Sequence, residues 1–300
     1  MMTGPIAIDG FTKRYGDFEA VSQLTLDVPE GSICGLLGPN GAGKTSTIKC
    51  LVGLARPTAG RISILGGPPR AAMFERVAFI PERSALYDNM TGEEHFSMAK
   101  HAYHTFEIVR ARKMLAIFDL DARKRVRKYS KGQKTAFALA LAFAIRPSVM
   151  ILDEPASGLD PINQRAVLDL LIEAAANGAT ILFSSHQIGQ VERAADRVAI
   201  LKRGKLIVDG IVDELKDNEK LIEATFERKP DLNGLASDLR VRRIEWRGNT
   251  MRAFVQSDHD AIAVAISAHA PNNLAILNLN LEEIFFNAVE EPRANTLEDV

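Results

Sequence analysis

A nine-residue segment, GPNGAGKTS at residues 38–46, constrains this chain more than any other feature. It fits the pattern G-x-x-x-x-G-K-[ST], and it lies between an apolar run at residues 32–37, which predicts a strand, and residues 45–54, which predict a helix. Glycines let the backbone curl so that N–H groups point at an anion, and the following helix adds the positive end of its dipole. The segment therefore predicts a phosphate-binding loop in an α/β fold.

We expect every residue of this loop to contact a nucleoside triphosphate. The set is Gly38, Pro39, Asn40, Gly41, Ala42, Gly43, Lys44, Thr45 and Ser46. Lys44 supplies a mobile cation for the β- and γ-phosphates, which makes it a catalytic candidate as well, and the Thr45 hydroxyl is placed to ligate Mg²⁺. A chance glycine-rich turn is the alternative, and the strand–loop–helix context disfavours it.

The run VMILDE at residues 149–154 is the second signal. Four apolar residues predict a buried strand, which ends at Asp153 and Glu154 on the side of an α/β sheet where ligands bind. Asp153 is a candidate to hold Mg²⁺ through water, and Glu154 is a candidate to orient or deprotonate an attacking water. Two solvated carboxylates are the alternative, which the upstream loop disfavours.

The segment YSKGQ, residues 129–133, lies between these two signals, and its serine is 23 residues before Asp153. It resembles LSGGQ, the signature of the ATP-binding subunits of ABC transporters. That resemblance implies that Ser130, Lys131, Gly132 and Gln133 contact a nucleotide. Taken alone, the segment is more typical of a helix that begins at an N-cap serine, Ser130.

Other positions match the same family in the same order. The resemblance implies that Tyr15 stacks on adenine, that residues 157–160 (SGLD) form the D-loop, and that His186 is a catalytic residue that contacts the γ-phosphate. Each has a plainer alternative: a strand-edge tyrosine, a helix N-cap at Asp160, and a structural histidine.

Three positions depart from the family pattern. Glu82 stands where the family usually has glutamine, and it remains a candidate to reach the nucleotide or its Mg²⁺. Lys131 replaces a signature glycine, and Ala136 stands where an arginine is frequent. We expect the first departure to add negative charge near the phosphates. We expect the second to make the signature loop bulkier and more basic, and the third to weaken the communication between the signature helix and the site.

The fold class we expect is α/β: a P-loop NTPase core with an antiparallel β subdomain and an inserted helical subdomain, followed by a small C-terminal α+β domain. The core takes residues 1–220, with the helical insert at about 88–147, where T-x-x-E at Thr91–Glu94 predicts a capping box. Residues 221–289 form the accessory domain, in which strand-like runs alternate with helical ones. Residues 290–300 are expected to be a loose tail.

Composition limits the remaining classes. With 37 Lys+Arg against 38 Asp+Glu and 46% hydrophobic residues, the chain is neither disordered nor strongly charged, so no nucleic acid partner is expected despite a basic cluster around the signature. Cys34 and Cys50 lie in apolar runs and are expected in the core. No run is long enough to span a membrane, and the first residues do not resemble a signal peptide.

The resemblance, strong over about two-thirds of the chain and weaker over the accessory domain, implies an ATPase subunit of an ABC transporter of the drug- and ion-exporter (ABC-2) type. ATP and Mg²⁺ are the implied cofactors. The implied partners are a second copy or a related ATPase subunit, closing head to tail on ATP, and separately encoded transmembrane permease subunits. The implied location is the cytoplasmic face of the membrane, or the cytoplasm if the subunit is isolated. A soluble ATPase of the same superfamily acting on nucleic acid or ribosomes, and a non-enzymatic nucleotide sensor, are the alternatives.

Overall fold

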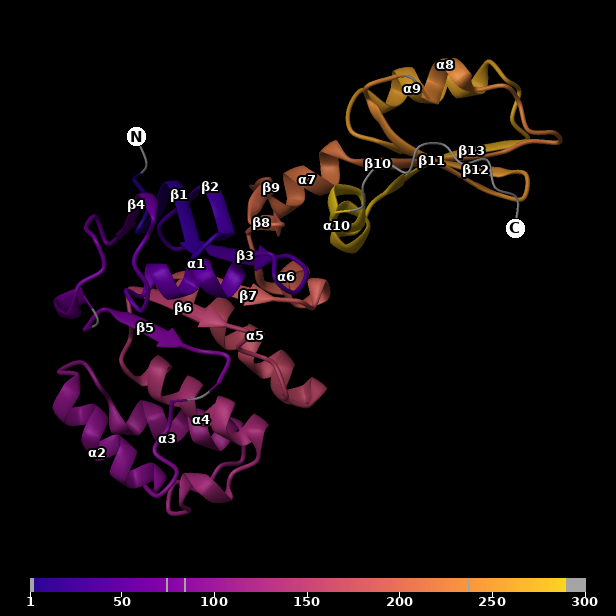
Figure 1. The fold of residues 1–300 in the computed structure, drawn as a ribbon. Helices are drawn as coiled ribbons and strands as arrows, with labels where there is room; N and C mark the ends of the chain where they lie inside the picture. Colours follow the sequence, from indigo (N-terminus) through magenta and orange to yellow (C-terminus); the bar gives the residue numbers. More distant parts are fainter. Residues whose placement is uncertain (1–2, 74, 84, 237, 290–300) are drawn as a thin grey trace. The chain divides into compact units, whose positions relative to one another are not determined.

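The computed structural model describes residues 3–73, 75–83, 85–236 and 238–289. The chain divides into two compact units, Met1–Asp209 and Gly210–Val300 (Figure 1). The division falls before the expected position, residue 220, because helix α7 (Val212–Asn218) packs on helix α10 (Leu281–Val289) and belongs to the second unit. The expected tail, residues 290–300, lies outside the described residues.

The first unit is built on a six-stranded sheet with the strand order β5-β6-β7-β3-β8-β9. The strands are β5 (Val77–Ile80), β6 (Val149–Asp153), β7 (Thr180–Ser185), β3 (Ile33–Leu37), β8 (Arg197–Lys202) and β9 (Lys205–Ile211). The four pairings from β5 through β8 are parallel, and β3, β6 and β7 are buried along their whole length. Their apolar sequences fit strands that are covered on both faces. The carboxyl ends of β6, β7 and β3 therefore lie next to one another.

A second, three-stranded antiparallel sheet has the order β2-β1-β4 and is the predicted β subdomain. Its strands are β1 (Ile6–Tyr15), β2 (Phe18–Val28) and β4 (Ala59–Ile64). Side chains of this sheet share one hydrophobic core with β3 and with helix α1 (Lys44–Leu51). Cys34 and Cys50 are buried members of that core, which confirms the prediction for both thiols.

The helical insert contains α2 (Gly92–Ala102), α3 (Ile108–Ile117) and α4 (Lys131–Ala144), and α4 packs beside the edge strand β5 (Figure 1). The predicted capping box at Thr91 is present. The apolar run beginning at Ala136 predicts a helix, but α4 begins one and a half turns earlier, at Lys131. Its first turn is polar, and Ser130 caps it, so the apolar pattern alone misses it.

Three further helices complete the first unit and begin the second: α5 (Pro161–Ala176), α6 (Ile188–Ala194) and α7. Asp160 caps α5 by accepting hydrogen bonds from the backbone N–H groups of Ile162 and Asn163, so its N-cap role is confirmed. The carboxyl ends of β6 and β7 lead directly toward α5 and α6. These two helices therefore support the loops that follow the central strands.

The second unit is a small α+β layer of its own. Its sheet has the order β11-β12-β10-β13, with every neighbouring pair antiparallel. The elements in chain order are β10 (Lys220–Thr225), α8 (Asn233–Ala236), β11 (Val241–Arg247), β12 (Thr250–Val255), α9 (His259–Ser267), β13 (Asn273–Asn278) and α10. This β-α-β-β-α-β order with the observed strand order is the split βαβ arrangement. One apolar core joins α9 to the sheet, and a smaller one joins Leu215 of α7 to Leu221, Phe254, Leu279 and Ile284.

Candidate functional site

The glycine-rich loop joins β3 to α1, as the sequence predicts, and two of its glycines are required by the backbone. Gly38 has φ +154°, and a Cβ there would collide with the carbonyl oxygen of Leu201. Gly43 has φ +107° at the N-cap of α1, and a Cβ there would lie 2.7 Å from the carbonyl oxygen of Ala20. Among the described residues, no side chain caps the first turn of α1. Its N–H groups are therefore available to an anion.

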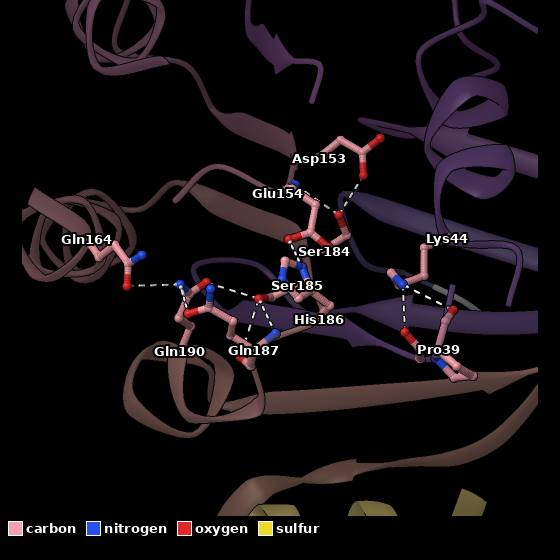
Figure 2. A network of polar contacts seen from close by, with 11 residues as sticks. Pro39, Lys44, Asp153, Glu154, Gln164, Ser184, Ser185, His186, Gln187 and Gln190 are labelled. Atoms are coloured by element: carbon pink, nitrogen blue, oxygen red, sulfur yellow. Dashed lines mark hydrogen bonds and ion pairs between the residues drawn. The ribbon is translucent and has the colours of Figure 1, made fainter. Parts of the chain in front are cut away.

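The Lys44 side chain folds back over this loop. Only 8% of the residue is exposed, and its ammonium donates hydrogen bonds to the carbonyl oxygens of Gly38 at 2.6 Å and Pro39 at 3.4 Å (Figure 2). Burial lowers the pKa of Lys44, and the negative charges of Glu154, Asp153 and Glu82 oppose that effect. The three carboxylates singled out in the sequence thus act on the same ammonium.

Asp153 and Glu154 leave the end of β6 with a shared partner on the next strand. Ser184 of β7 donates its hydroxyl to Oδ1 of Asp153 at 2.6 Å, and Oγ of Ser184 in turn accepts the backbone N–H of Glu154 at 3.0 Å. Glu154 has φ +55°, a left-handed conformation that is uncommon outside glycine and recurs at functional sites. Ser184 is not among the residues predicted from the sequence, although the pair of serines that ends this apolar strand is visible there.

His186 follows β7 and lies against Glu154, with its Nδ1 2.8 Å from Oε2 of the carboxylate (Figure 2). The two side chains differ in exposure, at 54% for His186 and 14% for Glu154. Burial raises the pKa of Glu154, while the His186 hydrogen bond and the charge of Lys44 lower it. The net effect raises the pKa of Glu154, which moves this carboxyl toward the range of a general base.

The signature segment is packed against the D-loop. Ser130 caps α4 in a capping box with Gln133, so the plainer alternative, a helix N-cap at Ser130, is confirmed. A Cβ on Gly132 would lie 2.6 Å from the carbonyl oxygen of Gly158, and the aliphatic part of Lys131 lies alongside Gly158. Within the described part of the chain, no hydrogen bond or ion pair links residues 130–133 to Lys44 or Glu154.

Comparison with known proteins settles the family. Residues 21–157 match the family described as ABC transporter. An uncharacterized ABC transporter ATP-binding protein of Bacillus subtilis, YhaQ, is 32% identical over 283 residues, which are 93% of this chain and 94% of the relative. The chain belongs to the ABC transporter family.

Two further likenesses cover the accessory domain and the core of this ABC protein. The Nod factor export ATP-binding protein I of Burkholderia lata is 32% identical over 95% of this chain and 97% of its own length. A solved structure of an ATP-binding subunit of an ABC transporter superposes with a TM-score of 0.66 at 33% identity, over 71% of this chain and 92% of that one. The α/β fold and the ATP-binding, ATP-hydrolysing class predicted from the sequence are confirmed. The alternative that acts on nucleic acid or ribosomes is not favoured by these relatives.

The remaining candidate site residues of this ABC subunit are Tyr15, Glu82, Thr45 and Ser46. Tyr15 ends β1 with 47% of the residue exposed, and the Lys13 ammonium lies 4.7 Å from its ring centroid. Tyr15 is therefore not packed in a core, and the Lys13 ammonium lies over its ring. Glu82 and Thr45 are exposed, and Ser46 is half-buried. Among the described residues, no helix is long and apolar enough to cross a membrane.

Magnesium fits the donors that the ABC subunit offers. Ser184 donates a hydrogen bond to one carboxylate oxygen of Asp153, and Thr45, in the first turn of α1, is exposed. The described residues contain no cluster of three or more His, Cys, Asp or Glu that would enclose a metal ion. Mg²⁺ is typically held by one or two carboxylates together with phosphate oxygens and water, so an enclosing cluster is not required.

Proposed function

We propose that this subunit hydrolyses MgATP at the site formed by residues 38–46, Asp153, Glu154 and His186, and that this hydrolysis powers export of a substrate across the cell membrane. The observation that carries the proposal is the convergence of Asp153, Glu154 and Glu82 on the buried Lys44 ammonium, with His186 placed on Glu154. The ammonium and the carboxylates thus lie near the carboxyl ends of the parallel strands, where such a sheet binds its ligands.

Lys44 and the amino end of α1 bind the phosphates in this proposal. Hydrogen bonds to the carbonyl oxygens of Gly38 and Pro39 already hold the ammonium within the loop. When ATP binds, the ammonium exchanges these neutral acceptors for charged phosphate oxygens. Charge-assisted hydrogen bonds are about twice as strong as neutral ones. Asn40, Gly41 and Ala42 complete the loop, while Tyr15 stacks on the base.

Glu154 orients the attacking water and accepts its proton, and His186 fixes the carboxylate while its other ring nitrogen faces the γ-phosphate. Asp153 and Thr45 would hold Mg²⁺, and the negative charge of Glu82 would adjust its binding. The ion would neutralise developing charge on the β- and γ-phosphate oxygens. The positive φ of Glu154 and the hydrogen bond from its N–H to Ser184 hold the carboxylate in place.

The assembly we propose has two ATPase subunits, either two copies of this chain or one copy with a related subunit. Ser130, Lys131, Gly132 and Gln133 of one subunit face the nucleotide held by the other, and closure on ATP is transmitted to separately encoded permease subunits at the cytoplasmic face of the membrane. Two observations support this choice: the amino end of the 14-residue helix α4 is an anion-binding feature, and relatives are named for Nod factor export and bacitracin transport.

ATP-driven association tests this assembly. We expect the Glu154→Gln variant to change from monomer to dimer by light scattering when ATP and Mg²⁺ are added, because it binds the nucleotide without consuming it. ADP should not produce the dimer, and neither should ATP with the Lys44→Ala variant. A Glu154→Gln protein that binds ATP yet gains no ATPase partner, alone or co-expressed with its permease, would contradict the assembly.

Glu82 should tune the response to Mg²⁺. Removing a negative charge from an exposed position weakens its hold on a cation by about 0.2–1 kcal/mol, so we expect Glu82→Gln to raise the Mg²⁺ concentration for half-maximal ATPase activity by up to about fivefold. A magnesium titration at fixed ATP measures this. The exposed Glu173→Gln variant on α5 is the matched control. An unchanged or lowered midpoint would remove Glu82 from the metal site.

A further inference from the structure

Three glutamines lie on the side of His186 away from Lys44 (Figure 2). Gln164 is on α5, Gln187 precedes α6, and Gln190 is on α6. None of them belongs to the nucleotide site described above. They connect the segment that carries His186 to the D-loop, residues 157–160.

The connection is a directed series of hydrogen bonds. The Ser185 hydroxyl donates to Oε1 of Gln190 at 3.0 Å, and Nε2 of Gln190 donates to Oε1 of Gln164 at 3.5 Å. Nε2 of Gln164 then donates to the backbone carbonyl oxygen of Leu159 at 3.0 Å. We call Ser185, Gln190, Gln164 and the Leu159 carbonyl the glutamine relay. Its donors all point in the same direction, from the end of β7 to the D-loop, an arrangement in which hydrogen bonds strengthen one another.

Gln190 is the central member, and its environment makes a polar side chain there costly unless it is fully bonded. Only 8% of the residue is exposed. Its amide oxygen accepts from Ser185, and its nitrogen donates to both Gln187 and Gln164. A buried amide without hydrogen-bond partners destabilises the fold, whereas an apolar residue of the same length fills the same space without that cost. The amide of Gln190 therefore positions its neighbours as well as filling space in the core.

The neighbours it positions are those on either side of His186. The ring of His186 is held by Glu154 alone among the contacts described for its side chain, and it is half-exposed. Its location therefore depends on the backbone of residues 185–187. Gln190 bonds the Ser185 hydroxyl on one side and the Gln187 amide on the other, at 3.0 and 2.8 Å, and Ser185 also accepts the Gln187 N–H at 3.0 Å.

We propose that Gln190 and Gln164 are positioning residues for ATP hydrolysis, which hold the His186 segment to the D-loop so that the imidazole stays on Glu154. The inference rests on the roles given to His186 and Glu154 under the proposed function. Neither glutamine contacts the nucleotide in this scheme. Both act through His186.

The kinetic test replaces each glutamine with methionine, which keeps the length and removes the hydrogen bonds. Loss of a buried hydrogen bond that positions a reacting group corresponds to a fall in kcat of about tenfold for Gln190→Met, and less for Gln164→Met. KM for ATP should stay within about twofold, because the phosphate loop is untouched. The exposed Gln256→Met variant in the other unit is the control and should match the wild type.

A double-mutant cycle separates positioning from a general loss of structure. If Gln190 acts through His186, Gln190→Met in a His186→Ala background should change kcat by less than about twofold, because the two changes remove the same contribution. A full additional tenfold loss would overturn the proposal. Thermal unfolding of each variant shows whether it folds. If Gln190→Met does not fold, the same cycle is measured with Gln164→Met.

A readout that does not depend on activity completes the experiment. The side-chain ¹H–¹⁵N signal of His186, identified by its loss in His186→Ala, should move in Gln190→Met and Gln164→Met and stay in place in Gln256→Met. An unmoved signal with wild-type kcat would overturn the relay. If the signal moves but His186→Ala hydrolyses ATP at the wild-type rate, the relay holds His186 as inferred and the proposed function of His186 is wrong.

Discussion

Replacing Glu154 with glutamine is expected to lower kcat for ATP hydrolysis by at least about 100-fold, while ATP still binds. The substitution keeps the size of the side chain and the backbone N–H bond to Ser184, but it removes the carboxylate that accepts a proton. The raised pKa of Glu154, caused by burial against the opposing effects of His186 and Lys44, suits a group that takes up a proton during the reaction.

Two measurements on the same protein decide this prediction. Single-turnover phosphate release gives the rate, and calorimetry with MgATP gives the affinity, which should stay close to that of the wild type. Glu173→Gln makes the same chemical change on the exposed side of α5 and should leave both quantities unchanged. Wild-type turnover by Glu154→Gln would remove Glu154 from the chemistry, whatever the binding result.

Replacing Lys44 with alanine should raise the Kd for ATP by at least about 100-fold, because two charge-assisted hydrogen bonds to phosphates are each worth about 1.5–3 kcal/mol. The ammonium lies within the loop it serves, bonded to the Gly38 carbonyl at 2.6 Å. Its removal therefore takes away the buried ammonium on which the charges of Asp153, Glu154 and Glu82 act.

Lys49→Ala is the matched control for this second variant, since Lys49 lies on the same helix but is exposed. Equilibrium titration with a fluorescent ATP analogue, with calorimetry as a check, measures both proteins. Thermal unfolding shows that each is folded under the assay conditions. An unchanged affinity in folded Lys44→Ala would refute the assignment of residues 38–46 as the phosphate-binding loop.

The parts of the site that the sequence predicts share one property, which is that the signal and the function lie within a few residues. The loop between β3 and α1 needs glycine where φ is positive, and the apolar strand β6 delivers two carboxylates at its end. Both constraints are local, so they are visible in the sequence. The structure adds the His186–Glu154 contact at 2.8 Å, whereas the family resemblance implies only that His186 contacts the γ-phosphate.

The parts that the sequence does not predict depend on residues that are distant in the chain. Ser184 reaches Asp153 only because β7 pairs with β6 in that register. Gln164 and Gln190 meet because α5 and α6 pack together, and single glutamines on two helices have no periodic pattern. The pattern of strand-like and helical runs changes beyond about residue 220, but the two units divide after Asp209, because this pattern cannot show that α7 packs with α10.

The contact between Gly132 and Gly158 limits the residues that position 132 accepts. With 2.6 Å between a would-be Cβ and the opposing carbonyl oxygen, no side chain fits between the two backbones. A larger residue at position 132 would therefore force the start of α4 away from the turn before α5.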